Sequence, residues 1–596
     1  MKSFESRDSI DNKYKWDLSH LYQSPKDWED KFEEAKELID GFPVSNSELF
    51  KSKEAFRGLI DKEEKLSELF GRLYLYAFLS KDVDMSNEEA LQRFGKIQSL
   101  ASELGQKTSY IEPNLLALEE SELKELFDGI SKTDYRQYLD NLIRKKAHTL
   151  SDKEEKIISA SSNLRSAAYN TFSLLKSTDI DFPTIEVEGK ETKLSDGQYS
   201  ALMYNKHEPT REKAYREYYK PYIAHKNTLA SLLDTSIKSF GFIAKTRNYK
   251  SNLYSSLHSN NIPESLFDKA IEQSIRLAPM LQMWAKIKAK KLKKKTISPF
   301  DTYVSLFDDS DTEYGYDENI TNVLNSLKPL GDDYLTKVKE AIDKNRIDVY
   351  ETKGKRSGAY SSGTTYGAPP YVLLNWKGTL NDVFTFTHEI GHNMHSVYTE
   401  ESQPQVYAGY SIFLAEVASI TNEALLHKYM ESNSDSTEEK LRLHELFLNK
   451  CLTTFFRQLQ FAYFEKEIHQ TVSSGTPLTP KYLSDTYEKI FKKYWSDSVI
   501  AEPEEAYSWT RIPHFYYNFY VFQYATGLAA GEYLAEAIIK DGKNSIGKYL
   551  DFLKAGRSKY PVDLMAETGA DLREDYLYDN LENKMRESLE YIEANI

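Results

Sequence analysis

Apolar residues recur at helical spacing along most of the chain. Two examples are the series Phe32, Ala35, Ile39 and the series Leu66, Leu69, Phe70, Leu73. Residues three and four positions apart lie on one face of a helix, so this spacing predicts amphipathic helices that pack against one another. A mainly helical fold is therefore expected.

The helical pattern is interrupted between about residues 181 and 202. Short β-prone stretches there are bordered by Pro183 and Gly189, which is typical of a small β-hairpin. The chain has 596 residues, more than the roughly 100 to 200 of one ordinary domain. We therefore place a domain boundary at the hairpin, between the segments 1–190 and 200–596.

Two stretches with strand character come before another helical segment. Residues 358–364 and 370–376 carry β-prone side chains between Gly and Pro borders, so they predict a small sheet. A helix is expected to start at Asn381 or Asp382, either of which can cap its first amides, and to run to about Thr399. An open strand edge beside this helix could hold an extended peptide by backbone hydrogen bonds.

On a helical wheel, this expected helix has an apolar side and an imidazole side. The apolar side carries Val383, Phe386, Ile390, Met394 and Val397, and the opposite side carries His388, His392 and His395. The arrangement predicts a helix whose back is buried and whose front can bind a metal ion.

Residues 388–392, His-Glu-Ile-Gly-His, match the pattern H-E-x-x-H of zinc metallopeptidases. His388 and His392 lie one helical turn apart, so both imidazoles can reach one ion. Glu389 lies about 100° round the helix from His388, where a general base for an attacking water is required. The pattern fixes only three positions, so the neighbouring residues have to support it.

A third metal ligand has to come from another segment. His395 lies roughly 10 Å from His388 along the helix, which is too far for one tetrahedral ion. Glu416 is the candidate, because it interrupts the apolar run 412–419 and an unpaired carboxylate is costly to bury. A buried salt bridge is the alternative explanation of Glu416.

Two further carboxylates are candidates for orienting the metal ligands. Glu423 lies seven residues after Glu416, on the same helix face, and Asp382 lies six residues before His388. Each could accept a hydrogen bond from the outer N–H of an imidazole. For both residues, a helix cap or an ordinary salt bridge is an equal alternative.

Charge and composition limit the partners. The net charge of −15 argues against binding to nucleic acid or to anionic membranes, because like charges repel. Seven lysines between residues 286 and 295 are the exception, and they indicate a solvated helix end or, alternatively, a site for an anionic partner. One cysteine, Cys451, cannot form an internal disulfide, and neither a signal peptide nor a membrane span is evident. A cytoplasmic location is expected, and the oligomeric state is left open.

Three groups of residues form a recognisable set. They are residues 388–392 with His395, the stretch Phe413-x-x-Glu416-Val417-Ala418-Ser419-x-x-Asn422-Glu423, and Arg511-Ile512-Pro513-His514-Phe515 with Tyr520-x-x-Gln523-Tyr524. With these residues the chain resembles the M3 (thimet-type) zinc metallopeptidases, and among them the oligoendopeptidase F branch. Weaker matches at Trp16-Asp17-Leu18, Pro299-Phe300-Asp301 and Gly358-Ala359-Tyr360 extend the resemblance over nearly the whole chain.

The resemblance implies an elongated, two-lobed, mainly helical body with a deep central channel and a small β-sheet next to the zinc-site helix. Segment 1–190 is then an N-terminal helical domain, and 200–596 is the zinc metallopeptidase catalytic domain. One Zn²⁺ per chain is implied, with His388, His392 and Glu416 as ligands and Glu389 as general base.

Further site residues also follow from the resemblance alone. It implies that His514 and Tyr520 contact the substrate and its developing oxyanion, and that Tyr524, Gly358 and Tyr360 bind substrate. Gly527 stands where the mammalian thimet-type pattern carries another Tyr, so the tyrosines of this chain depart from that pattern at one position. Without the resemblance, residues 512–524 would be interpreted as an aromatic core stripe.

The expected function is hydrolysis of internal peptide bonds in short oligopeptides, with Glu389 as the base for a metal-activated water. One alternative is a dipeptidyl carboxypeptidase-type exopeptidase on the same zinc site. The other is a helical binding protein in which the motif is incidental.

Overall fold

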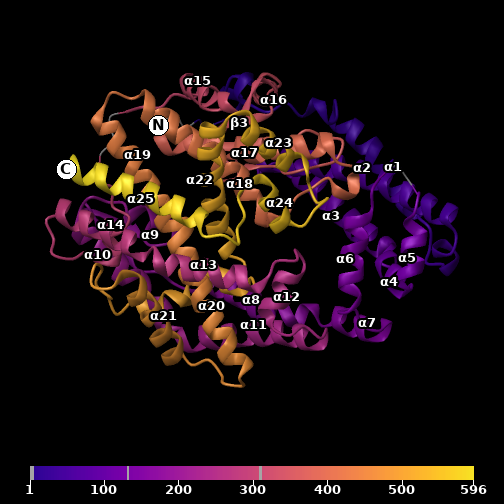
Figure 1. The fold of residues 1–596 in the computed structure, drawn as a ribbon, viewed down its shortest axis with the longest axis horizontal. Helices are drawn as coiled ribbons and strands as arrows, with labels where there is room; N and C mark the ends of the chain where they lie inside the picture. Colours follow the sequence, from indigo (N-terminus) through magenta and orange to yellow (C-terminus); the bar gives the residue numbers. More distant parts are fainter. Residues whose placement is uncertain (1–3, 5, 131–132, 308–311) are drawn as a thin grey trace. The chain divides into compact units, whose positions relative to one another are not determined.

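Helices make up most of the chain in this computed structural model, as the apolar spacing predicts (Figure 1). The structure describes residues 4, 6–130, 133–307 and 312–596. The chain forms two compact units. Unit 1 comprises Met1–Thr149, Thr312–Met430 and Leu534–Asp571, and unit 2 comprises Leu150–Asp311, Glu431–Tyr533 and Leu572–Ile596.

In its described residues, unit 1 contains twelve α-helices, the end of one that begins in unit 2, and a three-stranded sheet. The helices are α1 (Pro25–Asp40), α2 (Lys53–Asp82), α3 (Glu88–Thr108), α4 (Ile111–Ala117), α5 (Glu120–Phe127), α6 (Arg136–Lys146), α15 (Tyr316–Ser326), α16 (Asp332–Asp343), α17 (Leu380–Ser402), most of α18 (Ile412–Asn433), α23 (Lys543–Lys554) and α24 (Pro561–Thr568). The strands are β3 (Ile347–Tyr350), β4 (Tyr360–Ser361) and β5 (Val372–Trp376).

Unit 2 is built from helices and one hairpin. The α-helices are α7 (Asp152–Ala160), α8 (Ser162–Leu174), α9 (Asp196–Leu202), α10 (Glu208–Ala224), α11 (Lys226–Thr246), α12 (Asn252–His258), α13 (Glu264–Arg276), α14 (Ala278–Lys291), α19 (Thr437–Lys450), α20 (Arg457–Ser473), α21 (Pro480–Trp495), the first part of α22 (Phe522–Asp541) and α25 (Tyr576–Ala594). Two π-helical turns, Leu175–Asp179 and Cys451–Phe456, continue α8 and lead into α20. Among the described residues, no helix is both long and apolar enough to cross a membrane.

The hairpin predicted near residue 185 is confirmed. β1 (Thr184–Val187) pairs antiparallel with β2 (Lys190–Lys193), and Glu188 and Gly189 both have positive φ in the two-residue turn. Positive φ at both central residues is the geometry that matches the twist of the flanking strands. The division into domains 1–190 and 200–596 stays a prediction.

The small sheet predicted before the motif helix is also present, with one strand more than expected. Its order is β3-β5-β4, with β3 parallel and β4 antiparallel to β5, so β4 is an edge strand. Strand β3 was not predicted, because it has only four residues and its Asp348 is buried through ion pairs with Arg7 and Lys355, which come from outside the strand. Strands β4 and β5 pack against α17.

The N-terminal helices share a hydrophobic core with this sheet. Trp28 of α1 is fully buried and donates its indole N–H to the carbonyl of Leu73 in α2, at 2.9 Å. The same cluster of buried residues includes Tyr371 and Leu373 at β5. The sheet that lies against α17 is therefore supported by helices from the beginning of the chain.

The lysine run differs from the prediction at one position. Lys288 is buried, donates to the carbonyl of Val304 at 2.7 Å and lies 3.7 Å from the Glu445 carboxylate. Burial outweighs the Glu445 charge and lowers the pKa of Lys288 to about 8. A solvated helix end was therefore wrong for Lys288, because its helix face packs into unit 2, whereas Lys286 and Lys290 are exposed.

The buried Lys288 gives the stability of the protein a characteristic pH dependence. Between pH 8 and 10.5 the unfolded chain binds a proton at this lysine that the folded chain has lost, so stability rises with pH. Relative to Lys288→Met, the wild type should gain about 3 kcal/mol over this interval. Melting temperatures of both proteins at pH 8 and pH 10 measure it, and a constant difference would contradict the prediction.

Candidate metal centre and active site

Helix α17 carries the H-E-x-x-H motif, and its start differs from the prediction. The N-cap is Thr379, whose extended backbone lets its hydroxyl accept from the amide of Asp382, while Asp382 accepts from the amide of Thr379 at 2.8 Å. This is a reciprocal capping box. Asn381 and Asp382 are thus not the N-cap. Asp382 serves helix capping, the alternative role considered for it, and not orientation of a metal ligand.

The two faces of α17 agree with the helical wheel as far as Met394, but His395 of the predicted imidazole side is buried and Val397 of the predicted apolar side is partly exposed. Phe386, Ile390 and Met394 are almost fully buried, whereas the motif histidines keep part of their surface exposed. Helix α23 contacts α17 at His395 through Phe552, whereas on the apolar side Tyr316 of α15 packs against Phe386. Packing on this side leaves His388 and His392 on the open side of the helix.

Glu416, from α18, converges on these two histidines. The Nε2 atoms of His388 and His392 are 3.1 Å apart, and Glu416 Oε2 lies 3.5 Å from the first and 3.9 Å from the second. A tetrahedral ion with ligand bonds of about 2.0–2.1 Å separates its ligand atoms by roughly 3.3 Å. The donor atoms thus have the spacing that one such ion requires, and the three residues form a possible metal site.

Gly391 allows α17 and α18 to approach this closely. A Cβ atom at Gly391 would lie 2.5 Å from Ser419 Cα and 2.7 Å from the carbonyl oxygen of Ala418, both in the backbone of α18. Real Cβ atoms do not come so near to backbone atoms. The glycine of the motif is therefore a packing residue that sets the distance between the helix with two histidines and the helix with Glu416.

Glu423 orients His388, as one of the two alternatives for this residue predicted. The Nδ1–H of His388 donates to Glu423 Oε1 at 2.6 Å, which leaves Nε2 of His388 for a metal. Burial lowers the pKa of His388, but the Glu423 hydrogen bond and the charges of Glu423, Glu389 and Glu416 outweigh it and raise this pKa to about 9. Glu423 therefore fixes the orientation of the ring, and a metal ion at Nε2 would replace the proton that this raised pKa favours there.

Glu389 lies beside the ligand face, next to the edge strand. Its carboxylate is buried and accepts a hydrogen bond from the backbone amide of Ser361 in β4. Burial raises the pKa of Glu389 to about 7, and the nearby Glu416 adds to the effect while His388 opposes it. A cation bound at the three donor atoms would lower this pKa again, so Glu389 is placed to exchange a proton near neutral pH.

His395 does not contribute to the donor set, as its distance along the helix predicts. Its ring stacks on Tyr410 with centroids 3.7 Å apart and planes 6° from parallel, and burial lowers its pKa to about 3. Tyr410 also approaches the site, because its hydroxyl lies 3.4 Å from the His392 carbonyl oxygen. The sequence contained no signal for Tyr410, since it lies in the irregular link between α17 and α18.

Gly358 and Tyr360, the substrate residues predicted in unit 1, lie at β4. Gly358 has φ of +85° and its carbonyl accepts from the Asn375 side chain at 2.7 Å. The hydroxyl of Tyr360 donates to Asp82 of α2 at 3.0 Å. These contacts fix the edge strand, and a role in substrate binding stays a prediction for both residues.

The other predicted substrate residues come together in unit 2. The ring centroids of His514 and Tyr520 are 6.5 Å apart, with planes only 9° from parallel, and the Tyr524 hydroxyl donates to that of Tyr520 at 3.3 Å. Burial lowers the pKa of His514, and Lys176 adds to this effect, so the ring is neutral at neutral pH. The structure thus groups three polar aromatic side chains that the sequence alone would assign to a core.

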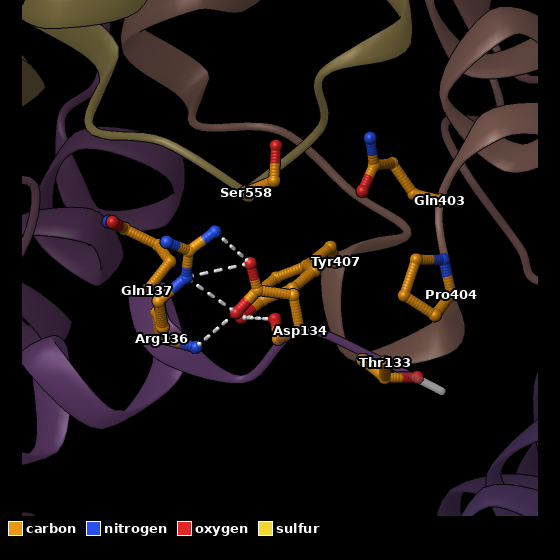
Figure 2. A pocket seen from close by; sticks show the side chains of 8 residues that line it. All are labelled: Thr133, Asp134, Arg136, Gln137, Gln403, Pro404, Tyr407 and Ser558. Carbon is orange, nitrogen blue, oxygen red and sulfur yellow. Dashed lines mark hydrogen bonds and ion pairs between the residues drawn. The ribbon is translucent and has the colours of Figure 1, made fainter. Parts of the chain in front are cut away.

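A separate pocket of about 620 Å³ lies on unit 1, at the link between α17 and α18 (Figure 2). It is lined by Thr133, Asp134, Arg136, Gln137, Gln403, Pro404, Tyr407 and Ser558. Figure 2 shows the Arg136 guanidinium directed at the Asp134 carboxylate, with Nη2 and Oδ2 2.5 Å apart. None of the predicted site residues lines this pocket.

Comparison with known proteins identifies the family. A sequence profile of Peptidase family M3 matches residues 201–581. The chain belongs to peptidase family M3. A second profile, Oligopeptidase F, matches residues 114–182. Together with the His-His-Glu donor set, membership of the M3 family makes the chain a metalloendopeptidase that acts on peptides and uses a divalent metal ion.

Similarity to individual M3 proteins covers nearly the whole chain. Oligopeptidase PepF of Bacillus subtilis is 36% identical over 561 residues, 94% of this chain and 83% of that protein. An oligoendopeptidase F homolog of Lactococcus lactis is 35% identical over 599 residues, 99% of each chain. The structure of oligoendopeptidase-F from Enterococcus faecium matches with a TM-score of 0.74 at 30% identity, over 96% of this chain and 98% of its own. An accidental motif is thereby excluded.

The contact at Gly391 predicts that Gly391→Ala disrupts the metal site. The methyl group has to displace the α18 backbone, which should cost about 1–3 kcal/mol of stability and move Glu416 away from the histidines. Metal content after dialysis and the melting temperature measure both effects. Gly95→Ala in α3 is the control, because a Cβ there meets nothing within 4 Å and should be neutral or stabilising. Equal metal content in both variants would contradict this role.

The bond from His388 predicts that Glu423→Gln weakens metal binding by about 10- to 100-fold, as loss of such outer contacts typically does. Titration with a competing chelator measures the affinity. Asp382→Asn is the matched control: it disturbs the capping box of α17 and should lower stability by about 0.5–2 kcal/mol without this loss of affinity. Metal binding that falls more in Asp382→Asn than in Glu423→Gln would reverse the two assignments.

Proposed function

We propose that this metalloendopeptidase uses one zinc ion per chain to hydrolyse internal peptide bonds of short oligopeptides. The observation that carries the proposal is the convergence of His388, His392 and Glu416 at 3.1–3.9 Å, with Glu389 beside them. Two neutral imidazoles and one carboxylate are a donor set typical of catalytic zinc sites, which leave a fourth position open. The names of the relatives, oligopeptidase and oligoendopeptidase F, support short peptides as the substrates.

In the proposed mechanism, zinc held by these residues would act as a Lewis acid toward the scissile carbonyl and the attacking water. Glu389 takes a proton from this water and then delivers it to the leaving amine. Burial raises the pKa of Glu389 and the zinc charge would lower it, and these opposing effects suit a group that first accepts and then releases a proton. Glu423 keeps His388 in the tautomer whose Nε2 is available.

We further propose that His514 and Tyr520 donate hydrogen bonds to the carbonyl oxygen as it becomes anionic. Such donors accelerate the reaction because their bonds strengthen in the transition state. A neutral His514 ring can still donate from one nitrogen, and the Tyr520 hydroxyl can donate while it accepts from Tyr524. Tyr524 is proposed to bind substrate.

The edge strand β4 is proposed to hold the peptide backbone of the substrate. Its Ser361 amide already contacts Glu389, so a peptide aligned with β4 would place a scissile bond near the base. Gly358 and Tyr360 are proposed to contribute to this binding. Because backbone hydrogen bonds recognise any sequence, broad selectivity for side chains is expected.

Glu389→Gln tests the proposed base. The amide cannot accept the proton, so kcat should fall by at least about 10²- to 10⁴-fold while the metal content stays near that of the wild type. Glu416→Gln is the comparison variant, and it should lose metal as well as activity. Peptide cleavage at the normal rate by a purified, metal-loaded Glu389→Gln protein would refute the assignment.

A library of peptides of several lengths, with and without blocked ends, tests the proposed substrate class. Cleavage of internal bonds in peptides blocked at both termini is expected, and addition of a chelator should abolish it. Mass spectrometry of the products reports the cut sites and the upper length limit. A requirement for a free C-terminus would favour the dipeptidyl carboxypeptidase-type alternative.

A further inference from the structure

Two consecutive residues before Tyr520 adopt a backbone conformation that is unfavourable for L-amino acids. The φ angles of Asn518 and Phe519 are +53° and +61°. Asn tolerates this left-handed region, but a bulky Phe rarely adopts it and does so only when the surroundings impose it. The turn sets the direction in which the chain enters Tyr520.

A buried carboxylate holds this turn. Glu465 of α20 is fully buried, and its Oε1 accepts from the backbone amide of Phe519 at 2.6 Å, across 54 residues of sequence. A second bond comes from the Ser256 hydroxyl, which donates to the carbonyl oxygen of Asn518 at 2.6 Å. The single peptide group that links Asn518 to Phe519 is thus bound at both its N–H and its carbonyl oxygen, from two different helices of unit 2.

Glu465 has little other bonding to explain its burial. Among the described residues, its Oε2 has no hydrogen-bond partner, and the nearest imidazole nitrogen, His469 Nε2, is 4.0 Å from Oε1. His469 Nδ1 is occupied by Asn252 at 3.1 Å, and burial lowers the pKa of His469 to about 3, so the ring carries no charge. Glu465 therefore forms no ion pair, and burial raises its own pKa to about 8.

Burying a carboxyl group costs desolvation free energy, whereas an apolar side chain of the same size would fill the same space without that cost. The one bond that Glu465 makes is to the turn. That turn leads directly into Tyr520. The Tyr520 ring lies parallel to the His514 ring, and the Tyr520 hydroxyl accepts a hydrogen bond from the Tyr524 hydroxyl. The carboxyl group is thus bonded to the backbone one residue before a proposed oxyanion donor.

We propose that Glu465 is a positioning residue, which fixes the left-handed turn at Asn518–Phe519 and thereby aims the Tyr520 hydroxyl. The inference rests on the proposed function of Tyr520. Glu465 itself touches neither metal nor substrate in this proposal. It acts by removing the freedom of the peptide that carries Tyr520, so that the donor is already in place when the oxyanion forms.

The test is a double-mutant cycle on the metal-loaded, full-length protein with one blocked oligopeptide. Glu465→Met keeps the volume and removes the acceptor, and it should lower kcat by about 10²-fold, as a donor displaced by about 1 Å typically does. Tyr520→Phe should lower kcat by about 10²- to 10³-fold. The kcat of the double variant should be no lower than that of Tyr520→Phe, because the hydroxyl that Glu465 positions is already absent.

Two further variants separate positioning from stability. Glu465→Gln retains a carbonyl acceptor of the same reach, so it should restore most of kcat. Glu445→Met is the matched control, since the buried Glu445 accepts from the amides of Leu306 and Phe307 at 2.8 and 3.2 Å, and that loop has no proposed role in the reaction. It should lower the melting temperature and leave kcat near that of the wild type.

The outcomes distinguish this inference from the proposed function. If the fold-losses of kcat in the two single variants multiply in the double variant, the inference is overturned while the role of Tyr520 stands. An unchanged kcat in Glu465→Met would have the same consequence. An equal kcat loss in Glu445→Met would overturn it too, since any buried carboxylate would then have the same effect. Full activity of Tyr520→Phe would overturn the role of Tyr520 and this inference together.

Discussion

The metal centre depends on the close contact of two helices at Gly391. Helix α17 supplies two imidazoles and α18 supplies one carboxylate, and the three donor atoms have to lie within the span of one ion. The contact with Ser419 and Ala418 allows this only because the facing residue has no side chain. Ligand chemistry and backbone packing are therefore inseparable here, and the glycine contributes to metal binding without touching the metal.

Negative charge is concentrated around the motif. Glu389, Glu416 and Glu423 all act on His388, and together they hold its pKa near 9 although burial opposes them. Such a cluster is costly without a cation, because like charges repel and are poorly solvated in the interior. A divalent ion would neutralise most of this charge, so the electrostatics of the chain and its donor geometry indicate the same ligand.

Local periodicity explains what the sequence could predict, and tertiary contacts explain what it could not. Helical spacing predicts that His388 and His392 share a face, and that Glu423 shares one with Glu416. Glu416 itself is a candidate because it is a carboxylate within an apolar run. The cap at Thr379 was missed because it depends on backbone angles that the residue types permit but do not dictate. Lys288 was misjudged, since its burial comes from elements that pack on α14 from elsewhere in unit 2.

Glu465 illustrates the limit most clearly. It lies on a helix with no motif, 54 residues before the amide that it binds, and nothing in its neighbourhood marks it. The strand β3 is similar, because the burial of its Asp348 depends on ion pairs with Arg7, 341 residues earlier in the chain, and with Lys355. By contrast, the grouping of His514 with Tyr520 was implied by family resemblance, which carries tertiary information that composition and spacing lack.

The three proposed metal ligands, the proposed base and Glu423 lie within residues 388–423, a single short stretch of the chain. Closing the loop between His392 and Glu416 costs roughly 3 kcal/mol of chain entropy, before any constant term. That cost is small beside the binding energies typical of structural zinc sites. An ion bound there would thus cross-link two consecutive helices at a small entropic cost.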